Sequence, residues 1–339
     1  MKPLEQQIVQ PAFYRKLKNG KIKCLLCQHY CELSEGQSGV CHVNKNVDGR
    51  LVNLVYGHIA ALNIDPIEKK PLYHFLPGTT ALSIGTIGCN MQCAFCQNWQ
   101  ISQQKTLIQK DFATPEQIVD LALKYRSKTI AYTYNEPAIF YPYARDIALL
   151  ARQHGLKNIF VTNGIESEEV IQDMSGIIDA ANVDFKAYDA QYYKRELKAP
   201  FVVRETLQLM KKAGLWIEVT TLIIPGINDQ PEHLKKIARF IAQKLGTETP
   251  WHISAFHPDY KMLDTPATPL TSIQQAYDIG RQAGLQFVYT GNIRHQQNTT
   301  YCPNCHKPLI ERLGYQILSN KIIDGKCVYC NHQIPGIWN

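Results

Sequence analysis

Long hydrophobic runs are missing from this 339-residue sequence. No run approaches the roughly 18 apolar residues that a membrane-spanning helix needs, and residues 1–7 lack the apolar core of a signal peptide. We therefore expect a cytoplasmic protein without a membrane partner. A strong charge of one sign is also missing, because the net charge is only +7 and the Lys and Arg residues are scattered. This charge permits an anionic partner without indicating one.

The composition is not that of a disordered chain, since 45% of the residues are apolar. A chain of this length and apolar content can bury a full core, with room for one large domain and appendages.

No cysteine is left over when the eleven are sorted by position. They form clusters of four, three and four: Cys24, Cys27, Cys31 and Cys41; Cys89, Cys93 and Cys96; and Cys302, Cys305, Cys327 and Cys330. In a chain without export signals, thiols at this density favour zinc or iron–sulfur clusters over disulfides. The division therefore predicts three metal sites, the middle one with an open position.

The middle cluster, Cys89 to Cys96, has three thiols that can converge on one metal centre but need a fourth ligand from elsewhere. It suits an iron–sulfur cluster, or a zinc ion that borrows a distant Cys or His. The cluster follows the apolar run 81–85 and a turn that contains Gly88, so it lies in the loop after a predicted strand. In α/β folds this edge of the sheet is where catalytic groups gather.

The two outer clusters each have four thiols, which can close a metal site. In the first, Gly36 and Gly39 allow the turns that bring Cys41 back to the other three, and the ion could be zinc or belong to a second iron–sulfur cluster. His29 and His42 could also ligate, but four thiols make this unnecessary. The last cluster reads CxxC-x21-CxxC in a short tail with few hydrophobic residues, which predicts a structural zinc site.

Between the clusters, apolar runs alternate with helical patterns about six times. Strands are expected at 79–83, 129–134, 158–162, 181–185, 216–222, 251–256 and 286–289. Helices are expected at 114–125, 140–154, 167–174, 203–213, 231–245 and 271–283, with Thr114 and Ser167 as N-caps. This order predicts an α/β fold with a parallel sheet, most simply a partial (β/α)6 barrel of the TIM type.

Two segments before this repeat are less regular. Residues 51–65 partly alternate between apolar and polar, which predicts a hairpin or an edge strand. Residues 65–75, DPIEKKPLYHF, are dense in charge, and two prolines hold them extended, so composition alone favours a solvated connector.

Polar residues collect where the predicted strands end. They are found at 134–137 (YNEP), 162–164 (TNG), 184–186 (DFK), 224–229 (IPGIND) and 257–258 (HP). Each could be a cap or a turn, but together they outline a pocket, because a row of buried polar groups is costly without a ligand.

The spacing of Cys89, Cys93 and Cys96 resembles the CxxxCxxC signature of the radical S-adenosylmethionine (SAM) superfamily. This resemblance implies that the three thiolates hold three irons of a [4Fe–4S] cluster, while the amino and carboxylate groups of SAM chelate the fourth. Electron transfer would then cleave SAM to methionine and a 5′-deoxyadenosyl radical.

Further motifs extend the resemblance. The strand-end segments 134–137, 162–164, 184–186 and 224–229 resemble the GGEP, TNG, DLK and IPGxND motifs of activating enzymes related to pyruvate formate-lyase-activating enzyme, although Tyr134 and Asn135 replace both glycines of GGEP. The motifs CxLCxHxCxLxxGxxGxC, DPIEKKPLYHF, CxFCQNWxIS, TYNEP, WHISAFHPDY, YTGN and CPxC…CxxC…IPGIW resemble the radical SAM member of the AmmeMemoRadiSam system over nearly the whole chain.

The resemblance also implies roles for single residues. Phe95 would contact the adenine, and Asn135 and Glu136 would line the methionine amino end. The ribose and the carboxylate would be bound by Asn163, Asp184 and Lys186, and His257 would lie near the nucleoside.

We therefore predict a radical SAM enzyme with a cysteine-rich segment at 1–60, a radical SAM barrel at 61–295 and a zinc-ribbon-like tail at 296–339. Its cofactors would be a [4Fe–4S] cluster, SAM and zinc, and an external low-potential donor would supply electrons. The substrate from which the radical abstracts hydrogen is not identified, and the ribbon and the mild basic charge favour a macromolecule. The alternatives are an activase that makes a glycyl radical on a protein, modification of a small molecule or RNA, and a non-catalytic cysteine-rich module that binds nucleic acid. That last alternative predicts basic stripes and stacking aromatic residues around the cysteines.

Overall fold

The computed structural model describes residues 8–104, 112–293 and 298–339. The chain forms two compact units. Unit 1 comprises Met1–Ile64, Ala81–Asp179 and Ala190–Leu215, and unit 2 comprises Asp65–Thr80, Ala180–Asp189 and Trp216–Asn339. The predicted division at residues 60 and 295 followed the cysteine motifs and stays a prediction.

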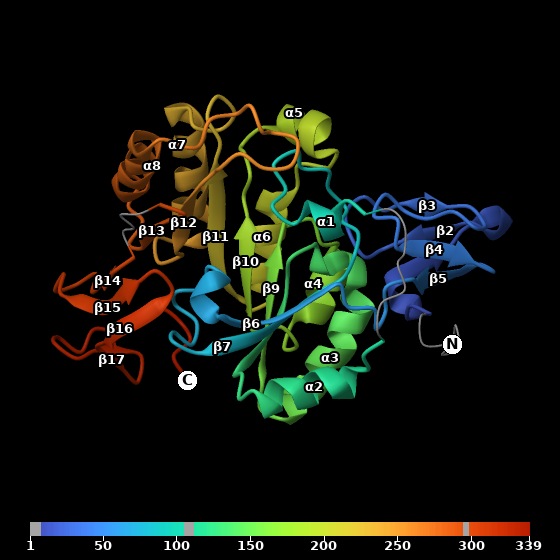
Figure 1. The fold of residues 1–339 in the computed structure, drawn as a ribbon, viewed down its shortest axis with the longest axis horizontal. Coiled ribbons are helices and arrows are strands. Elements are labelled where there is room, and N and C mark those ends of the chain that lie inside the picture. Colours follow the sequence, from blue (N-terminus) through green and yellow to red (C-terminus); the bar gives the residue numbers. More distant parts are fainter. Residues whose placement is uncertain (1–7, 105–111, 294–297) are drawn as a thin grey trace. The chain divides into compact units, whose positions relative to one another are not determined.

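Unit 1 contains parallel strands with helices between them (Figure 1). The strands β7 (Thr80–Gly85), β8 (Thr129–Tyr132) and β9 (Lys157–Thr162) pair in parallel and in this order. The helices are α1 (Trp99–Ser102), α2 (Pro115–Lys124), α3 (Tyr141–Gln153), α4 (Glu168–Met174), α5 (Ala190–Tyr192) and α6 (Val203–Lys212). Thr114 caps α2 in a complete capping box with Gln117, and Ser167 caps α4, as predicted.

The N-terminal part of unit 1 is built from short antiparallel strands. They are β1 (Tyr14–Lys16), β2 (Ile22–Cys24) and β3 (Glu32–Leu33) in one sheet, and β4 (Asn44–Val47) and β5 (Arg50–Asn53) in a hairpin. Strand β6 (Ala61–Pro66) follows, and residue Ala60 just before it donates a backbone hydrogen bond to Gly85, at the end of β7. The edge strand and the hairpin predicted around 51–65 are both present.

Unit 2 continues the alternation. The strands β10 (Ala180–Asp184), β11 (Trp216–Ile223), β12 (Trp251–Ala255) and β13 (Val288–Gly291) pair in parallel in this order. The helices α7 (Pro231–Phe240) and α8 (Leu270–Gln282) lie side by side, and α8 packs on β12 and β13 (Figure 1). The tail holds β14 (Thr300–Tyr301), β15 (Pro308–Leu313), β16 (Gln316–Asn320), β17 (Ile322–Ile323) and β18 (Lys326–Cys327), all antiparallel. The predicted α/β class with a mostly parallel sheet is confirmed.

Three predicted boundaries need correction. The strand expected to reach Tyr134 ends at Tyr132, because Tyr134 adopts a left-handed φ of 72°. The helix predicted to end at Leu245 changes from α-helix to a π-turn at Ile241. The strand predicted at 286–289 starts two residues later, at Val288.

The segment 65–75 is not a solvated connector, and this prediction was wrong. Glu68, Lys70 and His74 are each at most 3% exposed. Asp65 pairs with the buried Lys70 at 2.6 Å. The backbone N–H groups of Tyr73 and His74 donate to the buried carboxylate of Glu218, at 2.9 and 2.7 Å. Charge in this segment therefore marks buried pairing rather than solvation.

A chain of hydrogen bonds joins His74 to the tail of unit 2. The Nδ1 atom of His74 faces the carbonyl of Pro335 at 2.7 Å, which can only accept, so Nδ1 carries the proton and Nε2 accepts from the Tyr289 hydroxyl at 2.7 Å. Burial lowers the pKa of His74 to about 4, which keeps the ring neutral. The Tyr289 hydroxyl then accepts from Thr300 at 2.8 Å, and Thr300 accepts from Arg312 at 2.9 Å. Each hydroxyl in this chain donates to one acceptor, and Nη1 of Arg312 also donates to the carbonyl of Asn298 at 2.9 Å.

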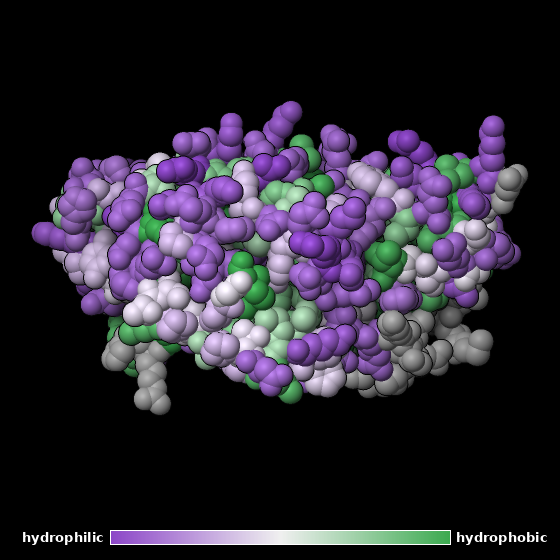
Figure 2. Space-filling model, turned by 90° about the horizontal axis from the view of Figure 1, so that it is seen from above, coloured by the Kyte–Doolittle hydropathy of each residue, from purple (hydrophilic) through white to green (hydrophobic). Residues whose placement is uncertain are grey.

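The face of the molecule drawn in Figure 2 is mainly polar. On the face drawn in Figure 2, hydrophobic residues are scattered among hydrophilic ones. Within the described ranges, the helices are too short or too polar to cross a bilayer.

Candidate functional site

The loop after β7 begins with two close backbone approaches. A Cβ atom on Gly85 would lie 2.6 Å from the carbonyl oxygen of Thr133, and one on Gly88 would lie 2.7 Å from that of Cys41. Gly88 also has a φ of 87°, which L side chains rarely adopt. The loop that carries Cys89, Cys93 and Cys96 is the thiol loop. Its start is therefore held between the end of β8 and the N-terminal cysteine segment.

Asn135 braces this loop with its whole side-chain amide. Its Oδ1 accepts from the backbone N–H of Thr86 at 3.1 Å, and its Nδ2 donates to the Thr86 hydroxyl at 3.0 Å and to the carbonyl of Gly88 at 2.9 Å. These bonds make Asn135 a support for the loop, and its contact with the methionine end of SAM stays a prediction. Tyr134 has a left-handed φ, which a glycine adopts without strain. This explains why the GGEP motif has a glycine at the position of Tyr134.

The thiols of the loop lie close enough for their charges to shift the pKa of Cys89. Cys93 is buried, while Cys89 and Cys96 are partly exposed. Burial raises the pKa of the Cys89 thiol, and the charges of Glu136, Cys93 and Cys96 raise it further. The sulfur of Cys96 lies 3.0 Å from the hydroxyl of Ser102. Iron must displace protons from such thiols, so cluster assembly here releases protons.

Glu136 and Asn163 form a buried polar rim on the same unit. The Glu136 carboxylate accepts from the backbone N–H of Ala138 at 3.0 Å, the Thr162 hydroxyl at 2.9 Å and the backbone N–H of Asn163 at 2.8 Å. The Nδ2 atom of Asn163 donates to Oδ1 of Asn90 at 2.9 Å, which links the rim to the residue after Cys89. The structure thus brings Glu136 and Asn163 together with the thiol loop. Phe95, within that loop, is buried.

Two further residues at this rim were missed by the sequence analysis. Glu166 is fully buried and contacts the Thr162 hydroxyl that Glu136 also uses. Burial raises the pKa of Glu166 to about 7, so a proton is available to this carboxyl pair. Asn90 is the second, and its place inside the cysteine motif was the only available signal.

Two buried acceptors at the rim have no hydrogen-bond partner among the residues that the structure describes. They are Oδ1 of Asn163 and Oε2 of Glu166. SAM carries an ammonium group and ribose hydroxyls, which are the donors that such acceptors need. The residues present therefore fit SAM.

The predicted SAM residues of unit 2 lie at the end of β10. The ammonium of Lys186 pairs with Asp184 at 2.7 Å, and the Lys186 side chain is 12% exposed. The amide of Asn228 donates to the carbonyl of Lys186 at 2.7 Å, which ties the 224–229 loop to this strand end. His257 is exposed. The structure brings Asp184 and Lys186 together but does not join His257 to them.

Replacing Lys186 with alanine should weaken SAM binding by roughly 1.5–3 kcal/mol, because a charge-assisted hydrogen bond is lost. Calorimetry on the anaerobically reconstituted protein would measure the dissociation constant. Lys157→Ala is a matched control, since Lys157 pairs with Asp179 at 3.0 Å in a similar ion pair. Equal affinities of the Lys186 variant and the wild type would remove Lys186 from the site.

The four thiols of the tail form a compact group. Their ligand atoms all lie within 4.8 Å of one another. The sulfurs of Cys302 and Cys330 are 3.6 Å apart, and those of Cys305 and Cys327 are 3.7 Å apart. Four thiolates around a tetrahedral zinc ion at about 2.3 Å lie about 3.8 Å from one another. The Asn304 amide donates to the Cys330 sulfur at 3.6 Å and lowers the pKa of its thiol, which favours the thiolate.

We expect the tail to keep one zinc ion per chain through aerobic purification, since zinc has no redox chemistry to lose. Elemental analysis of the purified protein, with Cys305→Ser as the variant that loses the ion, measures this. Iron at this site, or four thiols that react freely in the native protein, would contradict the assignment.

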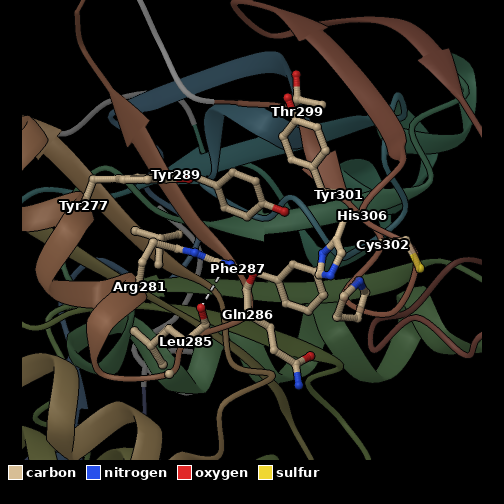
Figure 3. Close-up of a pocket in the computed structure, with 13 residues that line it drawn as sticks. Tyr277, Arg281, Leu285, Gln286, Phe287, Tyr289, Thr299, Tyr301, Cys302 and His306 are labelled. Atoms are coloured by element: carbon tan, nitrogen blue, oxygen red, sulfur yellow. Dashed lines mark hydrogen bonds between the residues drawn. The ribbon is translucent and has the colours of Figure 1, made fainter.

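A cavity of about 360 Å³ lies beside the tail (Figure 3). It is lined by residues of α8, of β13 and its approach, and of the tail, among them Tyr277, Arg281, Phe287, Tyr301 and His306. The guanidinium of Arg281 donates to the carbonyl of Leu285 at 2.7 Å, the bond drawn as a dashed line. None of the three thiols of the Cys89 loop lines the cavity. It is therefore not part of the loop that would hold the cluster.

Comparisons with known proteins agree with this geometry. The model of the Radical SAM superfamily matches residues 83–241, which include the thiol loop, Glu136, Asn163, Asp184 and Lys186. The uncharacterized protein MJ0808 of Methanocaldococcus jannaschii is 41% identical over 327 residues, covering 95% of this chain and 97% of that protein.

Two solved structures are also similar. Streptococcus suis SuiB bound to S-adenosylmethionine aligns over 66% of this chain and 52% of that chain, with a TM-score of 0.50 and 9% identity. A domain of pyruvate-formate lyase-activating enzyme from Bacteroides vulgatus aligns over 48% of this chain and 98% of that chain, with a TM-score of 0.43 and 17% identity. Residues 83–241 thus form a domain of the Radical SAM superfamily, and the chain is an enzyme of radical chemistry.

Proposed function

We propose that Cys89, Cys93 and Cys96 hold a [4Fe–4S] cluster at which SAM is reductively cleaved, and that the product radical abstracts hydrogen from a substrate. When bound, the cluster and SAM would supply the radical chemistry: one electron delivered to SAM would release methionine and provide the 5′-deoxyadenosyl group that takes a hydrogen atom from the substrate and leaves as 5′-deoxyadenosine. The electron comes from an external low-potential donor. The observation that carries the proposal is the thiol loop beside a buried rim with unsatisfied acceptors.

The residues of the chain would bind and orient the cofactors. Asn135 fixes the loop that carries Cys89, so the thiols are placed before iron binds. Oδ1 of Asn163 and the Glu136–Glu166 pair offer acceptors to the ammonium and hydroxyl groups of SAM. Lys186 would supply a compact cation for the carboxylate of SAM. The buried rim also excludes water from the reactive carbon.

The test is anaerobic reconstitution with iron and sulfide, followed by incubation with SAM and dithionite. We expect methionine and 5′-deoxyadenosine in equal amounts, because one cleavage gives one of each. A protein that binds iron at Cys89, Cys93 and Cys96 but cleaves no SAM would contradict the proposal.

A further inference from the structure

The four N-terminal thiols converge. Cys24, Cys27 and Cys41 are buried and Cys31 is partly exposed. The backbone N–H of Cys24 donates to the carbonyl of Cys31 at 2.9 Å, and the turn that begins at Cys27 lies between them. A Cβ atom on Gly39, two residues before Cys41, would lie 3.4 Å from the sulfur of Cys31. All four thiols therefore lie in one tightly folded segment.

These thiols are spread more widely than those of the tail. Among the described residues, which include all eleven cysteines, the tail is the only group of three or more candidate ligands within 4.8 Å of one another. One zinc ion draws its thiolates to about 3.8 Å from each other. In an iron–sulfur cluster each thiolate binds a different iron, so the sulfurs stand farther apart. The spacing at the N-terminal site therefore favours a cluster over a single ion.

The segment that carries the four N-terminal thiols packs directly against the Cys89 loop. The carbonyl of Cys41 closes on Gly88, where a Cβ would lie only 2.7 Å away. On the other side of Cys89, Nε2 of His29 lies 2.8 Å from the carbonyl of Asn90. Asn90 therefore lies beside the turn from Cys27 to His29. Residues on both sides of Cys89 thus touch the segment that holds the four thiols.

Asn90 also carries an unsatisfied donor. It is 3% exposed, and its Nδ2 makes no hydrogen bond of good geometry within the described chain. A buried amide donor is costly when left alone, and a thiolate or sulfide that carries negative charge is the acceptor it needs. Beside Cys27, such a donor fits a site loaded with metal.

We propose that Cys24, Cys27, Cys31 and Cys41 hold a second [4Fe–4S] cluster, which passes single electrons to the cluster at Cys89, Cys93 and Cys96. A reduced flavin or iron–sulfur protein gives one electron to the second cluster, which is oxidised again when that electron moves to the first. The contacts of Cys41 with Gly88 and of His29 with Asn90 make the path between the two clusters short. The relay rests on the function proposed above, whereas the second cluster itself does not.

The test compares iron in the wild type with iron in a variant in which Cys89, Cys93 and Cys96 are all alanine. After anaerobic reconstitution we expect about eight irons per wild-type chain and about four per variant chain, as two clusters and one cluster require. On reduction the variant should show one electron paramagnetic resonance signal of a [4Fe–4S]⁺ cluster. The zinc of the tail, measured in the same samples, reports whether each protein is folded.

The outcomes separate the two proposals. A folded variant that binds zinc but no iron at the N-terminal site would overturn the second cluster and leave the first intact. Four irons in both proteins would support the second cluster and refute the assignment of Cys89, Cys93 and Cys96. In the triple-alanine variant, Asn90→Leu should also lower the reduction potential of the remaining cluster, because a hydrogen bond to sulfur is lost. An unchanged potential would remove Asn90 from the site.

Discussion

Replacing Cys93 with alanine should abolish the release of 5′-deoxyadenosine from SAM. Cys93 is 8% exposed and offers one of three thiolates. Without it two thiolates remain, and a cluster that is not held on three sides cannot present its fourth iron to SAM. The measurement is chromatography of products after reconstitution and reduction, with the product expected to fall below detection. Cys89→Ala and Cys96→Ala should behave in the same way.

Zinc content is the control for this experiment. The zinc of the tail should stay at the wild-type value in the Cys93 variant, because the tail thiols lie in the other unit. A folded Cys93→Ala protein that still forms 5′-deoxyadenosine would show that the three thiols are not the cluster site.

Replacing Glu218 with glutamine should have the largest effect on stability. The Glu218 carboxylate is 0% exposed and accepts four hydrogen bonds, from the backbone N–H groups of Tyr73 and His74, from Nε1 of Trp216 and from Nε2 of His252. Burial alone would raise its pKa, but the hydrogen bond and charge of His252 outweigh burial and lower the pKa. The group is therefore a carboxylate.

Glutamine cannot satisfy these four donors. Each carboxylate oxygen accepts two of them, so either orientation of the amide points its NH₂ group at two N–H donors. Hydrogen bonds to charged groups contribute about 1.5–3 kcal/mol each, and breaking a buried pair costs roughly 3–5 kcal/mol after the surroundings relax. We expect the free energy of unfolding to fall by an amount at the lower end of this roughly 3–5 kcal/mol range. The thermal midpoint should then fall by on the order of 10 °C.

Circular dichroism at equal zinc and iron content would follow the unfolding. Glu232→Gln is the matched control, because Glu232 is an exposed carboxylate paired with Lys235 at 2.7 Å and should leave the midpoint unchanged. If the two variants unfold at the same temperature, the buried network does not stabilise unit 2 as described.

Features that depend on neighbours in the sequence were predictable. The caps at Thr114 and Ser167 are contacts over three residues, and the helix and strand patterns come from local periodicity. The cysteine spacing likewise located the thiol loop at the end of β7, because a loop must follow its strand.

Features that depend on distant partners were not predictable. The segment 65–75 looked solvated because its acceptor, Glu218, is about 145 residues away in the sequence. No sequence pattern shows that the Asn135 amide bonds to Thr86 and Gly88, which makes it a support for the loop. Sequence spacing also gives no distance between sulfurs, so zinc and an iron–sulfur cluster were indistinguishable at Cys24 to Cys41.

The ordered bonds from Arg312 through Thr300 and Tyr289 to His74 have an evolutionary consequence. Arg312 donates to Thr300, and Thr300, Tyr289 and His74 each accept from one neighbour and donate to the next, so a change at one of these three positions leaves a buried group unmatched on both sides. The tail of unit 2 is therefore not a module that another zinc ribbon could replace. Substitutions at these positions should therefore occur together in related sequences. A foreign zinc ribbon that keeps the four cysteines but lacks Thr300 and Arg312 should pack poorly against the rest of unit 2.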